Sequence, residues 1–138
     1  MPVTPHAYAH VRLTVTDIAR SREFYDRVFG LPVAFEMPAD ADDATKERLW
    51  FLFGGVVYRL GDSLLGLRPV GEDEFTEDRT GLDHVSFAVG STDDLDRAVV
   101  LLDELNVPHA GIKDLGGACI LEFRDPDNIA LELFALKA

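Results

Sequence analysis

Cysteine is almost absent from the sequence, and Cys119 is the only one. No disulfide can therefore form within the chain, which excludes a small fold stapled by disulfides. Cys119 lies in the apolar run 118–121 with no cationic neighbour in the sequence to activate its thiol. We therefore expect it to be a small buried residue and not a nucleophile.

Long apolar runs are also absent. None approaches the roughly 18 residues that a membrane-spanning helix requires. The first residues, Met-Pro-Val-Thr-Pro-His, lack the basic segment followed by an apolar one that marks a signal peptide. Together with the single cysteine, these absences predict a protein of the reducing cytoplasm.

Basic residues are scarce. The chain has 13 Lys and Arg against 25 Asp and Glu, which gives a formal net charge of −12. A surface of this sign repels the phosphates of nucleic acids and the headgroups of anionic membranes, so both are excluded as expected partners. A small molecule is the partner that remains.

The length of 138 residues predicts one domain, 1–138, with a core large enough to fold without a structural metal. Within this domain the sequence contains an internal repeat, because His10–Val15 aligns with His84–Val89 when the sequence is shifted by 74 residues. Each copy reads as strand, helix and then strands. We therefore predict module one at about 6–69, a linker at 70–80 and module two at about 81–136.

Periodicity and turn residues predict the elements. In the first copy we expect a helix at 21–29 after the cap residue Asp17, a loop at 37–47, and strands or β-rich segments at 10–15, 31–36, 49–53, 56–60 and 63–68. In the second copy we expect a helix that begins after Ser91 and ends at Asn106, and strands at 84–89, 110–113, 118–124 and 129–134.

The predicted fold is α+β, with two βαβββ modules that form a curled mixed sheet around a concave metal or ligand cavity. Alternation decides which side chains face this cavity. If Val11 and Leu13 pack on the helix, the neighbouring side chains turn the other way. The side chains expected in the cavity are His10, Arg12, Thr14, His84, Ser86, Glu132 and Phe134.

Two imidazoles and a carboxylate on one face suggest a metal site. His10, His84 and Glu132 are a donor set that suits Fe, Mn, Ni, Co or Zn, and three protein ligands leave positions open for substrate. The alternative interpretation is that both histidines bond to backbone and that Glu132 is solvated.

Other side chains have a functional and a structural interpretation. Glu122 is a candidate catalytic acid or base, or a surface carboxylate on a strand. Trp50, Phe51, Phe53 and Tyr58 are candidates to line a pocket for a flat apolar ligand, or are core residues.

At these residues the chain resembles the vicinal oxygen chelate superfamily, which includes glyoxalases, bleomycin resistance proteins and extradiol dioxygenases. The resemblance is carried by 10–21, Phe24-Tyr25, Gly30-Leu31, 81–87 and Phe123–Glu132. It implies metal ligands on the first, fourth, fifth and eighth strands, and a homodimer. On this chain the ligand positions are His10, Gly66, His84 and Glu132. Since Gly66 has no side chain, the resemblance leaves the two-His, one-carboxylate set of extradiol dioxygenases and fosfomycin-modifying enzymes.

The signatures of individual branches of the family reduce the number of expected reactions without selecting one. The tyrosine and histidine of the dioxygenase signature are replaced by Glu122 and the Lys113 region. The cations available to a phosphonate are Arg12, Arg68 and Lys113. We expect a metal-dependent lyase, isomerase, transferase or dioxygenase that acts on a small oxygen-bearing substrate. The alternative is an antibiotic resistance protein that sequesters a drug without catalysis.

Overall fold

The computed structural model describes residues 1–138, and its contacts divide the chain into two compact units, Met1–Asp73 and Glu74–Ala138. The boundary falls inside the predicted linker 70–80. No helix or strand occurs between residues 69 and 84. None of the helices combines the length and the apolar character needed to cross a membrane.

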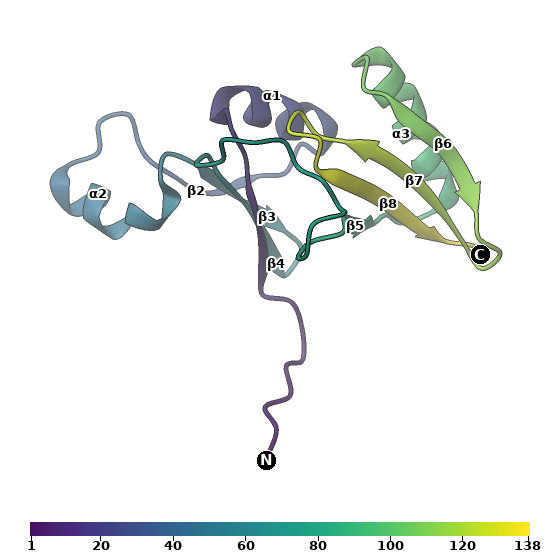
Figure 1. Ribbon diagram of the computed structural model, residues 1–138, viewed down its shortest axis with the longest axis horizontal. Coiled ribbons are helices and arrows are strands. Elements are labelled where there is room, and N and C mark those ends of the chain that lie inside the picture. The colour runs from purple at the N-terminus through teal and green to yellow at the C-terminus, as the bar shows by residue number, and fades with distance from the viewer. The chain divides into compact units, whose positions relative to one another are not determined.

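The first unit contains one four-stranded sheet and two α-helices (Figure 1). Its sheet has the order β1-β4-β3-β2, in which β1 is parallel to β4 and the other pairs are antiparallel. The elements are β1 (His10–Thr14), α1 (Ile18–Val28), β2 (Val33–Glu36), α2 (Asp43–Arg48), a 3-10 helix η1 (Trp50–Leu52), β3 (Val56–Leu60) and β4 (Ser63–Arg68).

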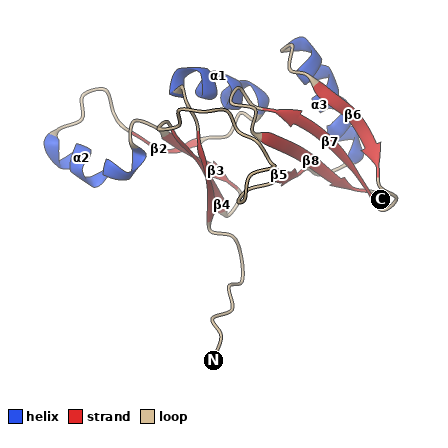
Figure 2. Cartoon of the chain, in the orientation of Figure 1, coloured by secondary structure: helices blue, strands red, loops and turns tan.

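The second unit repeats this topology with one helix, and Figure 2 shows that helix beside the sheet. The sheet order is β5-β8-β7-β6, and β5 is parallel to β8. The elements are β5 (Val85–Ala88), α3 (Thr92–Glu104), β6 (His109–Asp114), β7 (Ala118–Arg124) and β8 (Ala130–Leu136). The predicted α+β class and the two βαβββ modules are thus confirmed, as two separate four-stranded sheets.

Local sequence explains where the helices begin and end. Asp17 caps α1 by accepting a hydrogen bond from the backbone N–H of Arg20 at 3.1 Å. Asp94 closes the start of α3, because its carboxylate accepts from the N–H groups of Gly90 and Ser91. Asn106, the residue at which this helix was predicted to end, follows α3 at φ +57, a left-handed conformation that stops a helix.

Each unit has its core on the helix-facing side of its sheet. In the first unit, Leu13, Tyr25, Tyr58, Leu65 and Leu67 are almost completely buried. In the second unit α3 contacts β6, β7 and β8, and the buried residues include Leu95, Leu102, Leu121, Leu131 and Leu133. Cys119 is buried, as predicted. The opposite face of the second sheet carries Ser86 and Glu132, whereas that of the first sheet combines polar side chains with a second apolar cluster of Leu49, Leu52 and Val57.

Two segments of the first unit differ from the prediction. Part of the predicted loop 37–47 is the helix α2, which begins after the cap residue Asp42 and buries none of its residues. The predicted β-rich segment 49–53 is not a strand but the 3-10 helix η1, which ends at Phe53 with φ +51. An apolar run this short has no periodicity that separates a helical turn from a strand.

Candidate functional site

The open face of the second sheet carries the carboxylates. The strand register places Ser86 of β5 beside Glu132 of β8, and Glu132 beside Glu122 of β7. These side chains lie opposite the core residues Leu131 and Leu133, as strand alternation predicted. Glu132 is buried, and its Oε1 accepts a hydrogen bond from the Ser86 hydroxyl at 2.7 Å. The bond fixes one oxygen of the carboxylate, and the other, Oε2, faces His84.

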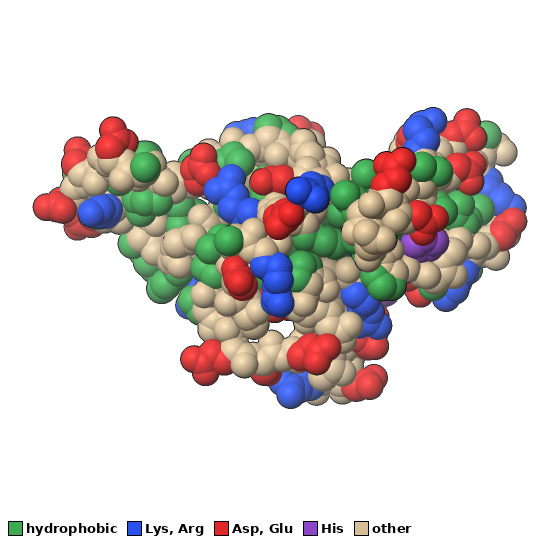
Figure 3. Space-filling view, turned by 90° about the horizontal axis from the view of Figure 1, so that it is seen from above, with side chains coloured by type: hydrophobic (Ala, Val, Ile, Leu, Met, Phe, Trp, Pro, Cys, Tyr) green, Lys and Arg blue, Asp and Glu red, His purple; other side chains and the backbone are tan.

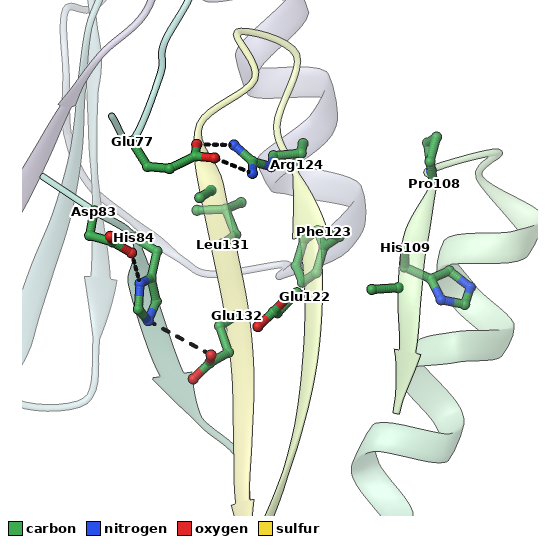
Figure 4. A pocket seen from close by; sticks show the side chains of 12 residues that line it. Glu77, Asp83, His84, Pro108, His109, Glu122, Phe123, Arg124, Leu131 and Glu132 are labelled. Atoms are coloured by element: carbon green, nitrogen blue, oxygen red, sulfur yellow. Dashed lines mark hydrogen bonds and ion pairs between the residues drawn. The ribbon is translucent and has the colours of Figure 1, made fainter. Parts of the chain in front are cut away.

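His84 directs its Nε2 atom toward Oε2 of Glu132, and Figure 4 shows the two side chains pointing toward one another. The distance from His84 Nε2 to Glu132 Oε2 is 3.7 Å. The other ring nitrogen, Nδ1, lies 2.5 Å from Asp83 Oδ1. This hydrogen bond raises the pKa of the His84 imidazole against the opposing effect of burial, and the negative charge of Glu132 adds to the increase. Asp83 therefore orients the ring, as carboxylates do for metal-binding histidines.

These groups line a cavity of about 450 Å³ that lies entirely within the second unit. One wall is formed by Arg124, whose guanidinium makes a two-point ion pair with Glu77 at 2.6 and 3.0 Å. His109 also lines the cavity, but its Nε2 is held by Asp103 at 2.8 Å. The volume accommodates a small molecule rather than a macromolecular segment.

Glu122 lies in the same cavity and has a cationic partner. Its Oε2 lies 3.2 Å from Nζ of Lys113 on the neighbouring strand β6. Lys113 thereby offsets part of the repulsion between the two adjacent glutamates, Glu122 and Glu132. On the same face the register places Phe134 beside Ala88, farther along β8. Both predicted residues, Glu122 and Phe134, are thus on the face of the sheet that carries Glu132.

The open face of the first sheet carries a different set. His10 and Arg12 line a smaller cavity of about 140 Å³ together with Gly66, and the register places Arg12 beside Gly66 and Thr14 beside Arg68. Arg12 donates a hydrogen bond to the carbonyl oxygen of Phe51 in η1. The β1 residues predicted for the cavity therefore share one face of this sheet with Gly66 and Arg68 of β4.

Two of the predicted aromatic pocket residues are exposed, because 68% of Trp50 and 48% of Phe53 is accessible to solvent. Their rings meet edge to face at 6.1 Å, and the guanidinium of Arg68 lies 4.4 Å from the centre of the Phe53 ring. Both residues are available to a ligand on this side of the first unit.

Tyr58 requires a correction as a pocket residue. It is 1% exposed and lies on the helix-facing side of the first sheet, where its hydroxyl donates to Asp26 of α1 at 2.8 Å. Burial raises the pKa of its phenol, and the hydrogen bond with Asp26 adds to the increase. The run Val56–Tyr58 is buried on both faces, so its sequence gave no alternation from which the direction of Tyr58 could be deduced.

The donor atoms of the second unit fit a first-row metal ion in part. Metal bonds of about 2.0–2.2 Å to nitrogen and oxygen separate two neighbouring donors by roughly 3–3.5 Å. The 3.7 Å between His84 Nε2 and Glu132 Oε2 is close to this spacing. Within either unit, no three His, Cys, Asp or Glu side chains are gathered as a metal site. His10, the third predicted ligand, belongs to the first unit.

Two contacts around the cavity have little or no signal in the sequence. Asp83 immediately precedes His84, and this adjacency was the only signal for its contact. The pairing of Glu77 with Arg124 joins residues 47 positions apart, one of them in a segment without helix or strand. No periodicity predicts such a contact, because it depends on the path of the connecting segment.

Comparison with known proteins identifies the family. The family model of the glyoxalase/bleomycin resistance protein/dioxygenase superfamily matches residues 7–133. A glyoxylase/bleomycin resistance protein/dioxygenase domain from Frankia sp. EAN1pec is 29% identical, with a TM-score of 0.76, and the match covers 97% of this chain and 100% of that one.

Two other structures share the fold at lower identity. A fosfomycin resistance protein from Listeria monocytogenes, solved with Mn(II) and 1S,2S-dihydroxypropylphosphonic acid, is 14% identical with a TM-score of 0.73 over 97% of this chain and 95% of that one. A lactoylglutathione lyase from Agrobacterium tumefaciens is 19% identical with a TM-score of 0.69 over 95% and 94%. No curated protein matches the sequence. From the family match and the paired βαβββ units, the chain belongs to the glyoxalase/bleomycin resistance protein/dioxygenase superfamily.

Proposed function

We propose that the protein is a divalent-metal-dependent enzyme that acts on a small oxygen-bearing substrate. The observation that supports this most directly is the convergence of His84 Nε2 and Glu132 Oε2 at 3.7 Å. Each of these side chains is held by a second contact, His84 by Asp83 and Glu132 by Ser86. Carboxylate and hydroxyl groups placed behind ligands in this way are a common feature of metal sites.

His84 and Glu132 would hold the ion, and we assign the third ligand to His10. His10 is the first residue of β1 and corresponds in the repeat to His84, which immediately precedes β5, and it lies in the pocket of the first sheet. We also propose, from the family resemblance, that the protein is a homodimer. The assembly decides whether the His10 of a site comes from the same chain or from the second chain. When bound, the metal would polarise two neighbouring oxygens of the substrate.

Glu122 is the group that we propose for proton transfer at the substrate. It lies in the cavity beside Glu132, and its Oε2 lies 3.2 Å from Nζ of Lys113. A carboxylate that is not used as a metal ligand can accept a proton from a bound carbon or oxygen acid. Isomerisation, addition and oxygen insertion are all compatible with this assignment.

The metal assignment is tested by metal content and thermal stability. Protein treated with EDTA is titrated with Mn(II), Fe(II), Co(II), Ni(II) and Zn(II). We expect one or more of these ions to raise the melting temperature, because a ligand at 100 times its Kd stabilises the native state by about 2.7 kcal/mol. The variants His84→Ala and Glu132→Gln should lose this rise. His6→Ala, in the exposed segment before β1, is the matched control and should keep it.

A second function is favoured by the exposed aromatic side chains. Trp50 and Phe53 present their rings to solvent, which suits a protein that sequesters an antibiotic without catalysis, as in the bleomycin resistance branch. If no first-row metal binds at low micromolar concentration, or if the variants keep the full thermal shift, the metal proposal is wrong. The sequestration function would then take its place.

A further inference from the structure

Two arginines on the open face of the first sheet have no carboxylate partner. Arg12 bonds to the backbone carbonyl of Phe51, and Arg68 lies over the ring of Phe53. The Nε atom of Arg12 is buried without any hydrogen-bond partner. Other arginines of this acidic chain do pair with carboxylates, namely Arg22, Arg27, Arg97 and Arg124. No carboxylate of the chain therefore neutralises these two guanidinium groups.

The two cations also lie close enough to repel one another. Burial lowers the pKa of the Arg12 guanidinium, and the positive charge of Arg68 lowers it further. Two like charges on one face of a sheet are unfavourable when water is partly excluded. An anion bound between them would relieve this repulsion, and in a chain with 25 acidic residues the absence of such a residue here is informative.

The repeat makes this arrangement specific to the first sheet. The register pairs Arg12 with Gly66 in the first unit and Ser86 with Glu132 in the second, so Gly66 stands at the topological position of Glu132. A Cβ at Gly66 would lie only 3.0 Å from Cγ of Arg12. The arginine stem therefore occupies the space of a side chain at this position. Where the second sheet presents a carboxylate, the first presents a cation.

An apolar pocket is lined in part by Arg12, while Arg68 lies outside this lining, two residues farther along β4 than the lining residue Gly66. Its volume is about 140 Å³, and its lining includes the rings of Phe35 and Phe51, which meet edge to face at 6.2 Å, and the side chains of Val57 and Leu64. An apolar cavity of about 150 Å³ accommodates one benzene molecule. The pocket therefore has room for one six-membered ring, with the guanidinium of Arg12 at its wall.

We propose that this pocket binds a carboxylic acid with a ring-sized apolar body, whose carboxylate is held by Arg12 and Arg68. The inference names the class of substrate for the proposed function and rests on that function only for the reaction that follows binding. Arginine suits this task because its planar fork of N–H donors matches a carboxylate. A single negative charge is favoured over a dianion, because the chain as a whole carries a charge of −12.

The test uses the full chain after EDTA treatment, so that binding is measured without any metal. Calorimetry and thermal shift are recorded with benzoate, and with benzyl alcohol, acetate and phenylphosphonate as comparisons. We expect benzoate to bind about tenfold or more tightly than the neutral ring and than the anion without a ring, and more tightly than phenylphosphonate. Its affinity should fall with added NaCl, because the interaction is between charges.

Two arginine variants test which side chains bind the carboxylate. Arg68→Met and Arg12→Met keep the aliphatic stems and remove the charges, and each should weaken benzoate binding about tenfold, the usual loss for a charge-assisted hydrogen bond. Arg27→Met, an equal change of charge on the exposed surface of α1, is the matched control and should leave binding within about twofold. If Arg12→Met folds poorly, Arg68→Met carries the test alone, because Arg68 is only partly buried and lies over an exposed ring.

The proposal is overturned if benzoate binds no more tightly than acetate or benzyl alcohol, or if the control loses as much affinity as Arg68→Met. Tighter binding of phenylphosphonate than of benzoate would overturn the choice of a carboxylate. Failure here is distinct from failure of the metal site, since His84→Ala should still bind benzoate and Arg68→Met should still show the metal-dependent thermal shift.

Discussion

Arg124 shows how one residue ties an irregular segment to the candidate site. Its guanidinium binds both carboxylate oxygens of Glu77, at 2.6 and 3.0 Å, and also donates to the carbonyl oxygen of Asn128 at 3.1 Å. Glu77 lies in the segment that follows the first unit, and both partners line the cavity of the second sheet. The hydrogen bonds from Arg124 lower the pKa of Glu77 from 4.5 to about 2.

This pKa predicts a pH-dependent contribution of Glu77 to stability. A carboxylate whose pKa is lower in the folded state stabilises that state above its unfolded pKa of 4.5, and the contribution is lost as the pH falls toward 2. Glu77→Gln should therefore be less stable than the parent at pH 7, and the difference should shrink between pH 4.5 and pH 2. Urea unfolding across this range measures it. Glu74→Gln, an exposed neighbour, is the control, and a difference that is independent of pH would contradict the assignment.

Among the secondary-structure elements, those with a periodic apolar face were predictable. The strands 63–68 and 118–124 were predicted with the bounds that the structure has, because turn residues mark both ends of each. The helix α2 was missed because it buries no residue and so has no apolar stripe. Its local signals are the cap residue Asp42, whose carboxylate accepts a hydrogen bond from the Thr45 backbone N–H, and the charges of Asp43 in its first turn and Arg48 in its last.

Strand alternation also predicted only some of the residues of the candidate site. Strand parity was sufficient to place Ser86 and Glu132 on one face of the second sheet, because Leu131 and Leu133 fix the direction of β8. It was insufficient for Tyr58, whose strand is buried on both faces. Contacts that depend on connections between elements, such as Glu77 with Arg124, have no counterpart in the periodicity of the sequence.

The conformation at the end of α3 depends on one residue, Asn106. The N–H of Val107 donates to the carbonyl of Leu102 at 2.8 Å, and the N–H of Asn106 donates to that of Asp103 at 3.1 Å. This pair of bonds is the Schellman motif, which requires a left-handed residue at Asn106.

Substitutions at Asn106 should therefore follow backbone strain rather than helix propensity. Asn106→Ala places a Cβ in the left-handed conformation without the compensation that asparagine has, at a cost of about 1 kcal/mol. Asn106→Gly should remain within a few tenths of a kcal/mol of the parent or exceed it. Chemical denaturation of the three proteins gives these differences, with Glu104→Ala in the same turn as the control. Equal stability of the alanine and glycine variants would be inconsistent with the motif.

At the scale of the whole molecule, charge of one sign dominates. The net charge is −12, and on the face that Figure 3 shows the acidic side chains are distributed and do not form one patch. Exposed ion pairs such as Arg27 with Glu23 contribute less than about 1 kcal/mol each. Repulsion among the unpaired carboxylates opposes folding, because folding brings these charges closer together than they are in the expanded chain.

Salt should therefore stabilise this protein. The screening length falls from about 30 Å at 0.01 M to about 8 Å at 0.15 M salt, which weakens long-range repulsion more than it weakens contacts between paired charges. We expect NaCl over this range to raise the melting temperature by about 4 °C, the shift that corresponds to about 1 kcal/mol in a domain of this size. A variant with Asp40→Asn, Glu72→Gln and Glu74→Gln carries three fewer negative charges at exposed positions and should show a smaller rise. A melting temperature that stays constant or falls with salt would mean that the ion pairs outweigh the repulsion, and thermal unfolding at matched pH distinguishes these results.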